Sequence, residues 1–505
     1  MTIFARTGQT ALAATLMVGT AAHADVSAQQ VWDSFKENMA LYGESSLSVG
    51  SEEMSGDTLT VSDVVLTISD AETTVTSDLG TLTFTETGDG TVSVGMPTTT
   101  PLTIRIEPTF GTPATLNASV TQEAMDLIVG GTPEEMTYDI SAARYVVSLD
   151  SVEGEEADVT LNAAQLAISD IAGTYQITTD EALQTIESAL AAGSVTIAVD
   201  IAETGGPGLF QFMGTIDGLE TTGTVSLPVD MDMEAPEMAF VDGLLVDAGY
   251  EFGASNYAFS FAEEGNTAEG TASAESGSMA VFMDASGFSY AGGATAPSVS
   301  ISGSDLPFPV EVSMAEYSYG ISLPLAATDS PEEFGADLLI SELSVNDAVW
   351  SIIDPRGVLD HGPATISLDI SGLVALAYDV LDPMQMQAMM MADVPGELYE
   401  VMINDLTVRA AGAEILGSGG FTFDNTDLDT FGGMPRPEGS AAVEITGANQ
   451  LIDKLVQMGL VPEEQVMGAR MMMGMFAQVT GDDQMRSELE INEQGHVIVN
   501  GQRIQ

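Results

Sequence analysis

Apolar and polar residues alternate along most of this chain, a period of two that is typical of half-buried β-strands. From Met54 onward, stretches rich in Thr, Val, Ser and Gly follow one another, and turns containing Gly or Pro separate them. This pattern dominates residues 54–290 and returns at residues 336–370. The sequence therefore predicts a mainly β protein, an elongated, curved antiparallel sheet or sheets with an N-terminal helix and a helical hairpin near the C-terminus.

Three predicted strands share an irregular spacing of their apolar residues, i, i+2, i+5 and i+7. They cover residues 59–66, 338–345 and 401–408, and a polar pair containing an acid lies at each odd step. A strand alternates with a period of two, so each odd step needs a bulge or a bend. Repeated bulges would curve the sheet strongly, as in the wall of a groove. The alternative is that ordinary bulges of a large sheet happen to share this spacing.

Helical periodicity is limited to a few segments. The first covers residues 27–43, and its apolar face is formed by Val31, Trp32, Phe35 and Met39. A short amphipathic helix is predicted over residues 179–192, and a Met-rich one over residues 384–391. The pattern of residues 449–479 predicts the helical hairpin, and Gly459 is expected to end its first helix.

Residues 1–24 have the features of a secretory signal peptide. Arg6 precedes a short apolar core, and Ala22-His23-Ala24 supplies a small-x-small cleavage site. No later stretch reaches the roughly 18 uninterrupted apolar residues that a membrane span needs. We therefore expect a periplasmic or secreted protein with no integral membrane segment after signal cleavage.

The charge of the chain is strongly one-sided. Asp and Glu number 76 against 11 Lys and Arg, which gives a formal net charge of −65. Residues 145–355 contain no Lys or Arg at all. A surface this anionic repels phosphate backbones and anionic headgroups, which excludes nucleic acid as a main partner.

The length of the chain favours two domains or one elongated body. We predict two β-rich parts, residues 25–295 and residues 296–505, with a soft boundary near residues 292–297. The chain has no Cys, so no disulfide can support either part. The fold must therefore rely on its apolar core.

Few residue types in this chain suit catalysis or a cofactor. Only His361 and His496 follow the signal peptide, and no Gly-x-Ser-x-Gly elbow occurs, so zinc and serine hydrolase sites lack their signatures. Paired-carboxylate hydrolysis stays open, although no particular pair of acids stands out. We expect no cofactor and favour a protein that is not an enzyme.

One acidic stretch offers oxygen ligands for a hard cation such as calcium. Its carboxylates are Asp424, Asp427 and Asp429. The stretch lacks the Gly and the distal Glu of an EF-hand loop. A solvated acidic turn is therefore the preferred interpretation, with calcium as the alternative.

The segment around Trp350 contains the clearest turn in the chain. Asp354, Pro355 and Gly357 occupy the positions that a type I turn favours, with Arg356 between them. Arg356 is the first basic residue after Arg144, and acids greatly outnumber bases around it. We expect its guanidinium to bond a nearby carboxylate.

The string from Trp350 to Gly372, with Asp354-Pro355-Arg356-Gly357 and Gly362-Pro363-Ala364-Thr365 inside it, resembles the proteobacterial family called domain of unknown function 2125. Residues 306–309 and 499–501 look similar too, which would extend the resemblance over most of the chain. The family commonly has a basic residue just before Pro-Ala-Thr, where this chain has His361-Gly362. The resemblance implies an exported envelope protein and supplies no activity, cofactor or catalytic residue.

These observations favour an exported envelope protein that is a non-catalytic β-groove binding protein for an apolar or lipid-like ligand. Met467, Met471 and Met475 in the second helix of the hairpin are the predicted ligand-lining residues, because Met suits adaptable apolar surfaces. Core packing is the alternative role of these side chains. A structural or calcium-stabilised envelope module and a carboxylate-based secreted hydrolase remain the alternative functions.

Overall fold

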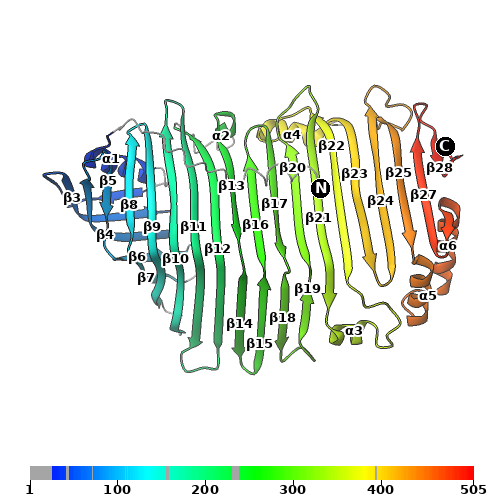
Figure 1. Cartoon of the computed structure of the whole chain (residues 1–505), viewed down its shortest axis with the longest axis horizontal. Helices are drawn as coiled ribbons and strands as arrows, with labels where there is room; N and C mark the ends of the chain where they lie inside the picture. The colour runs from blue at the N-terminus through cyan, green and yellow to red at the C-terminus, as the bar shows by residue number, and fades with distance from the viewer. Residues whose placement is uncertain are drawn as a thin grey trace.

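The computed structural model describes residues 25–505 except residues 41–44, 71, 109, 111, 155–158, 230–237 and 393–394. The predicted signal peptide and Gly43, the predicted end of the first helix, lie outside the described residues. In the described part, 29 strands form one sheet in which neighbouring strands are antiparallel, accompanied by six helices (Figure 1). The predicted fold class is thus confirmed, including the N-terminal helix and the helix pair near the C-terminus.

The strands fall into three groups along the sheet. The first group comprises β1 (Ser45–Ser48), β2 (Ser51–Ser55), β3 (Thr58–Ser69), β4 (Thr73–Glu86), β5 (Val92–Gly95), β6 (Thr99–Ile106), β7 (Ala114–Glu123), β8 (Asp126–Thr132), β9 (Glu135–Gly154), β10 (Val159–Thr179), β11 (Leu183–Glu203) and β12 (Leu209–Pro228). The second comprises β13 (Leu245–Phe252), β14 (Ser255–Glu263), β15 (Asn266–Ala274), β16 (Ser276–Met283), β17 (Gly287–Thr295), β18 (Ser298–Gly303), β19 (Val310–Ser313) and β20 (Glu316–Pro324). The third comprises β21 (Glu332–Val345), β22 (Ala364–Leu376), β23 (Gly396–Ala410), β24 (Ala413–Asp424), β25 (Arg436–Thr446), β26 (Gln478–Gly481), β27 (Gln484–Ile491), β28 (Val497–Val499) and β29 (Gln502–Arg503).

The helices lie at the ends and edges of this sheet (Figure 1). They are α1 (Ala28–Ala40), α2 (Met238–Val241), α3 (Asp347–Ile353), α4 (Pro383–Met391), α5 (Ala448–Met458) and α6 (Glu463–Phe476). Helix α4 and the α5–α6 pair occupy the segments predicted to be helical. The predicted second helix of the hairpin is shorter than expected, because Gln478 and Val479 begin strand β26. None of the helices in the described residues is long and apolar enough to cross a membrane.

Between the long strands β12 and β21, short strands form two rows that continue the sheet, β13–β16–β17–β20 and β14–β15–β18–β19. Strand β12 pairs with β14 through residues 209–216 and with β13 through residues 220–226. Strand β21 likewise pairs with β19 and β20. The sheet is therefore continuous from the first group of strands to the third.

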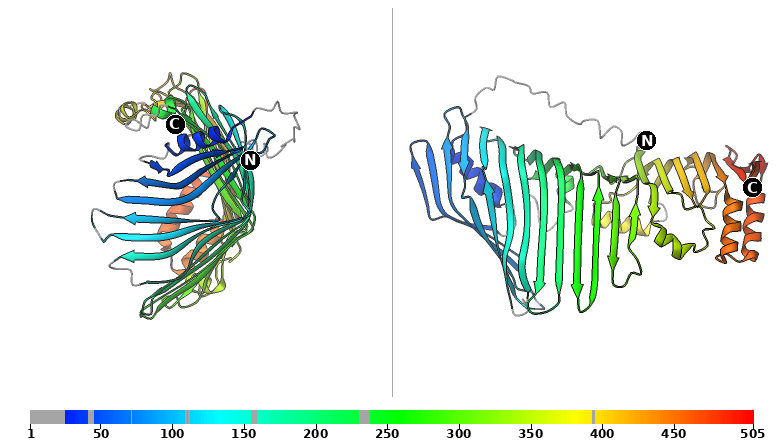
Figure 2. Two further views of the ribbon diagram at one scale, coloured as in Figure 1. Left: turned by 90° about the vertical axis from the view of Figure 1, so that its left-hand side faces the viewer. Right: turned by 60° about the horizontal axis from the view of Figure 1, so that its bottom comes forward.

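A line of bulges and breaks runs across the middle of the strands, and we call it the bend line. Asp63, Asp170 and Glu342 adopt left-handed backbone conformations inside long strands, and Ala296 does so between β17 and β18. The backbone amide of Ala296 donates to the carbonyl of Ala315, whose amide donates to Ser341. Bulges bend strands and increase their twist, and Figure 2 shows the resulting sheet curved into an open, C-shaped cross-section.

All three bulges predicted from the spacing of apolar residues are confirmed. The strand register shifts between Val61 and Val64, between Ile340 and Leu343, and between Ile403 and Leu406. The first two shifts contain Asp63 and Glu342 of the bend line. The odd step in the sequence is therefore the signal of a bend that keeps both halves of each strand on the same face.

The helix predicted over residues 179–192 was wrong. Residues 183–192 instead belong to strand β11, which pairs with β10 and with β12 over its whole length. Ile186, Leu190 and Ala192 share a face because their spacing is also even, so the apolar positions fit both periods. Pairing on both sides decided the outcome, since a strand between two neighbours buries its backbone polar groups in ladders.

The predicted boundary near residues 292–297 falls inside the continuous sheet. Gly292 and Gly293 lie in strand β17 rather than in a linker, and β17 pairs with both β16 and β20. Glycine here serves close packing, because a Cβ atom on Gly293 would lie 2.6 Å from the carbonyl oxygen of Tyr317. The division of the chain into two β-rich parts stays a prediction.

The buried core lies at the N-terminal end of the sheet. Helix α1 packs there with Trp32 fully buried against Phe84, and the Trp32 indole nitrogen donates to Glu52. The rest of this core comes from the first strands, including Leu59, Val61, Val92, Val129, Met136 and Tyr138. Beyond Ala198, the buried apolar residues in the described chain are only Ala239, Leu325, Ala375, Val466 and Met485. Most of the sheet therefore has no second layer.

Candidate ligand-binding surface

One face of the sheet is apolar from its first strands to its last, and we call it the apolar face. Directly paired residues of antiparallel strands point to the same side, so the register assigns each residue to a face. Leu166, Ile197, Gly214, Tyr257 and Ala272 form one such row across β10, β11, β12, β14 and β15. Further along, Tyr319, Leu338, Leu368 and Leu406 form another row.

The apolar face is the concave one. Tyr138, Tyr175 and Ile177 belong to it and also to the core around α1, and α1 lies inside the curve of the sheet in both views of Figure 2. The α5–α6 pair lies at the opposite end of the sheet (Figure 1). Between these ends the apolar side chains remain partly in solvent, with Phe210, Phe261 and Leu323 exposed by about two fifths.

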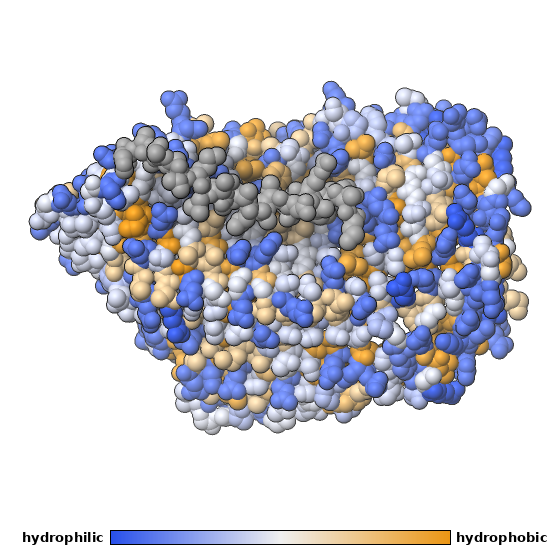
Figure 3. Space-filling view, viewed as in Figure 1, coloured by the Kyte–Doolittle hydropathy of each residue, from blue (hydrophilic) through white to orange (hydrophobic). Residues whose placement is uncertain are grey.

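The opposite, convex face is polar. It carries residues such as Thr222, Thr224, Asp247, Ser278 and Glu251 on neighbouring strands. Figure 3, which views this face, shows hydrophilic residues scattered over its whole extent, with weakly polar and apolar ones between them. A shallow, open hollow of about 390 Å³ lies on this polar face and is lined by Thr137, Thr174, Glu187 and Thr222 among others.

Aromatic rings on the apolar face cover glycines of the neighbouring strand. Gly214 is paired with Tyr257, Gly277 with Phe252, and Gly292 with Tyr319. A Cβ atom built on these glycines would lie 3.0, 2.3 and 2.9 Å from the facing aromatic side chain, respectively. The missing side chain lets each ring lie across the sheet instead of standing up from it.

Four tyrosines form a group in the middle of the apolar face, and we call it the tyrosine cluster: Tyr250, Tyr290, Tyr317 and Tyr319 from β13, β17 and β20. The ring centroids of Tyr290 and Tyr319 are 5.4 Å apart, and those of Tyr317 and Tyr319 are 5.7 Å apart. The Tyr290 hydroxyl also lies 3.2 Å from the sulfur of Met279. A hydrogen bond with Tyr290, together with desolvation, raises the pKa of Tyr319 to about 12.

Sequence reasoning missed this cluster and the ring-on-glycine pairs. The signal was present in aromatic residues two positions apart, such as Phe210 with Phe212 and Tyr317 with Tyr319. That spacing places both rings on one face of a strand. The neighbouring strand that supplies the glycine could not be identified without the register.

The predicted turn at Asp354 is confirmed, but its arginine bonds a different group than expected. The Gly357 amide donates to the carbonyl of Asp354, and Gly357 has a positive φ of 61°. The Arg356 guanidinium lies 3.4 Å from the carbonyl oxygen of Gln457 near the end of α5. Among the described residues it forms no ion pair with a carboxylate. The negative end of a helix dipole replaces the predicted carboxylate partner.

Asp354 is the buried centre of this motif. Its Oδ2 accepts a hydrogen bond from the Leu359 amide at 2.6 Å and lies 3.3 Å from His361 Nε2, whose ring stacks on Trp350. Burial opposes the charge of Asp354, but the Leu359 amide, His361 and the Val358 amide outweigh it and lower its pKa. The motif joins α3, which lies at an edge of the sheet, to the following loop (Figure 1).

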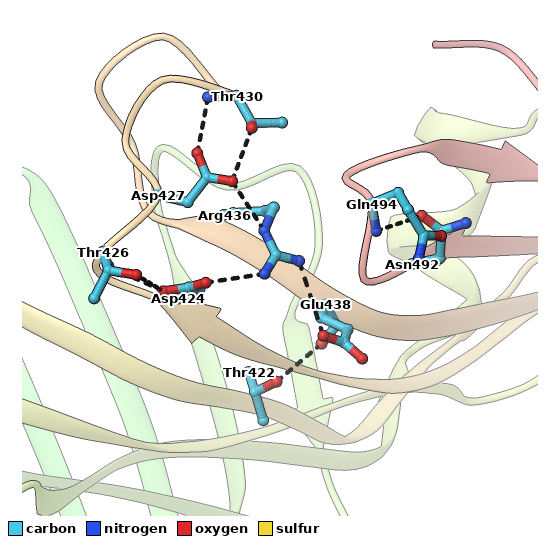
Figure 4. A network of polar contacts seen from close by, with 9 residues as sticks. All are labelled: Thr422, Asp424, Thr426, Asp427, Thr430, Arg436, Glu438, Asn492 and Gln494. Atoms are coloured by element: carbon cyan, nitrogen blue, oxygen red, sulfur yellow. Dashed lines mark hydrogen bonds and ion pairs between the residues drawn. The ribbon is translucent and has the colours of Figure 1, made fainter.

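Two of the three candidate calcium ligands are bonded to an arginine (Figure 4). Arg436 Nη2 lies 2.9 Å from Asp424 and Nε lies 3.0 Å from Asp427. Hydrogen bonds from Thr426 and then Arg436 lower the pKa of Asp424. Asp429 takes no part in this network, and the described residues contain no group of three acids or histidines suited to a metal ion. The guanidinium thus supplies the positive charge at this turn.

Met467, Met471 and Met475 follow one another at helical spacing on α6, and between 62% and 70% of each is exposed. Helix α6 lies at the C-terminal end of the sheet rather than over its middle (Figure 1). Core packing is therefore not their role in this chain. Their predicted role in lining a ligand site stays a prediction.

Three aspartates face one another on the polar face. Asp337, Asp369 and Asp405 are directly paired across β21, β22 and β23. Desolvation and then the charge of Asp369 raise the pKa of Asp337. Among the described residues, these acids come nearest to the paired carboxylates of a hydrolase. They lie on an open face, outside the hollow described above and outside a second hollow lined by residues such as Asp126 and Asp139.

No curated protein matches the chain. Residues 357–502 match the family of domain of unknown function 2125, described as an uncharacterized protein conserved in bacteria. The match begins at Gly357, so it leaves out Trp350 and the first three residues of the turn. Over these residues, the C-terminal part of the chain is similar to this family.

Proposed function

We propose that this protein is an exported, non-catalytic binding protein that holds an apolar, lipid-like molecule on the apolar face of its sheet. The observation that carries the proposal is that the described residues form no second layer over that face between α1 and the α5–α6 pair. Large exposed apolar patches on proteins mark binding surfaces. Where the sheet buries neither face in a core, it gains stability when a ligand covers the apolar face.

The shape and charge of the molecule favour a small apolar ligand over nucleic acid or an anionic membrane surface. The convex face carries many carboxylates and would be repelled by anionic lipid headgroups. Rings that lie across glycines leave the concave side open along its length. An acyl chain fits such a surface because it needs contact area and no fixed geometry.

The proposal is tested by binding of diphenylhexatriene, an apolar fluorophore, to matched variants. Phe210 and Phe261 are paired on the apolar face of β12 and β14, while Met213 lies on the polar face of β12 with 54% exposed. Phe210→Glu combined with Phe261→Glu should weaken probe binding about tenfold, since carboxylates resist apolar contact. Met213→Glu should leave it unchanged.

Two results would overturn the proposal. One is equal binding by both variants, with circular dichroism showing that each is folded. The other is light scattering that shows a dimer whose formation excludes the probe, because a second copy would then cover the apolar face. Export is tested separately: fractionation of the native cells with N-terminal sequencing should find the chain outside the cytoplasm, beginning at Asp25.

A further inference from the structure

The tyrosine cluster places phenol hydroxyls in the middle of an otherwise apolar surface. Tyr250, Met279, Gly292 and Tyr319 form one directly paired row across β13, β16, β17 and β20. Tyr290 and Tyr317 lie beside this row on the same face. Tyrosine combines an apolar ring with a hydrogen-bonding tip, so such a group suits a molecule with both characters.

Two of these hydroxyls have unused bonding capacity. Among the described residues, Tyr250 and Tyr317 have no hydrogen-bond partner for their hydroxyls, and each residue remains partly exposed. The rings of Tyr290 and Tyr319 contact each other, and the Tyr290 hydroxyl donates to the sulfur of Met279, so these two residues are held within the cluster. A phenol hydroxyl can donate a hydrogen bond to a ligand and can also accept one.

The charge around the cluster restricts what these donors can bind. Strands β10–β21 lie within residues 145–355, where the chain has no Lys or Arg. The carboxylates of the chain repel an anionic headgroup there, and no cation offsets them. A neutral acceptor such as an ester or a hydroxyl meets no such repulsion and takes a hydrogen bond from phenol.

We propose that the tyrosine cluster is the recognition point for the polar end of the ligand, and that the ligand is an uncharged lipid with ester or hydroxyl oxygens. This inference rests on the proposed function and names the ligand class of that surface. Acyl chains lie along the apolar face on either side, and the phenols bond the polar end. Fatty acid anions are discriminated against by charge.

The test compares three probes on the full-length mature protein at pH 8. Diphenylhexatriene reports the apolar face alone, monoolein supplies a neutral polar end, and oleate supplies the same chain with an anionic end. Monoolein should displace the fluorophore at a concentration at least about tenfold lower than oleate. Tyr250→Phe combined with Tyr317→Phe should weaken monoolein about fivefold for each lost hydrogen bond and leave the fluorophore unaffected.

The matched control is Tyr399→Phe, because the Tyr399 hydroxyl bonds Glu397 outside the cluster. It should bind all three probes like the wild type. If the wild type does not bind the fluorophore, the proposed function fails and this inference with it. If the fluorophore binds but oleate equals monoolein, or the double variant retains monoolein affinity, the ligand class is wrong while the apolar binding surface stands.

Discussion

The phenyl ring of Phe252 lies over Gly277 of the neighbouring strand, so that a Cβ atom on residue 277 would be 2.3 Å from the Cζ of the ring. No L-side chain fits this position unless the ring moves. This relationship shows why the large rings of the apolar face do not project far from the sheet. They lie across it because the paired residues on the neighbouring strands have no side chain. Glycine here is needed for packing and not for a turn.

Gly277→Ala should therefore lower the free energy of unfolding by about 1–3 kcal/mol, the usual cost of overpacking. Denaturant unfolding followed by circular dichroism measures the change. Gly474→Ala on α6 is the control, because nothing lies within 4 Å of its Cβ position. That variant should be as stable as the wild type or slightly more stable. Equal stability of Gly277→Ala and the wild type would contradict the packing argument.

Asp337→Asn should stabilise the protein at neutral pH. The pKa of Asp337 is raised by burial and by Asp369 directly opposite, so the folded state loses stability as the pH rises and the carboxyl ionises. Removing the charge should add about 0.5 kcal/mol at pH 7 and nothing below about pH 4, where the wild-type carboxyl is protonated. Asp247→Asn, with Thr224 and Phe282 opposite, is the control. A neutral or destabilising effect at pH 7 would count against the pairing.

Asp354→Asn should lower the melting temperature, with an opposite pH dependence. The pKa of Asp354 is lowered, since the Leu359 amide and His361 outweigh the effect of burial. Its ionised form therefore contributes stability above the ordinary pKa of about 4, and that contribution is lost as the pH falls through the lower folded-state value. Melting curves from pH 7 to pH 3 should show the two proteins converging. A difference in melting temperature that grows as the pH falls would contradict this prediction.

Arg436→Gln should lower the melting temperature by several degrees and create sensitivity to calcium. Without the guanidinium, Asp424 and Asp427 are left with no positive charge between them. Calcium should then raise the melting temperature of the variant, although it leaves the wild type unchanged. Arg409→Gln is the control, because Arg409 pairs with Glu414 at an exposed position, where ion pairs contribute little. Stabilisation of the wild type by calcium would instead support the metal alternative.

The sequence predicted those parts of the fold that depend on local pattern. The odd steps at Asp63 and Glu342 located bulges because both halves of each strand must keep their apolar residues on one side. The same logic failed at Ile186 and Leu190, whose even spacing fits a helix face as well as a strand face. Pairing with β10 and β12 decides between helix and strand here. The local sequence of one segment does not reveal which distant segments it pairs with.

The sequence predicted an apolar binding surface, but it did not predict which residues form the apolar face of the sheet. Met467 was chosen because Met density signals an adaptable surface, whereas the continuous apolar face comes from residues on more than ten strands. Tyr250 and Tyr319 are 69 positions apart in the chain and come to lie in one row of the sheet, with β16 and β17 between them, through a register that composition does not determine. The partner of Arg356 was missed for a similar reason, since a helix end far along the chain supplies it.

The strands at the C-terminal end of the sheet are shorter than those near β11. Strand β11 has 21 residues, β22 has 13 and β27 has 8, which at about 3.3 Å per residue correspond to roughly 70, 43 and 26 Å. The concave surface therefore narrows toward the C-terminal end. A long apolar molecule lying parallel to the strands would have more contact area at β11 than at β27. Its binding would therefore be weaker over β27 than over β11.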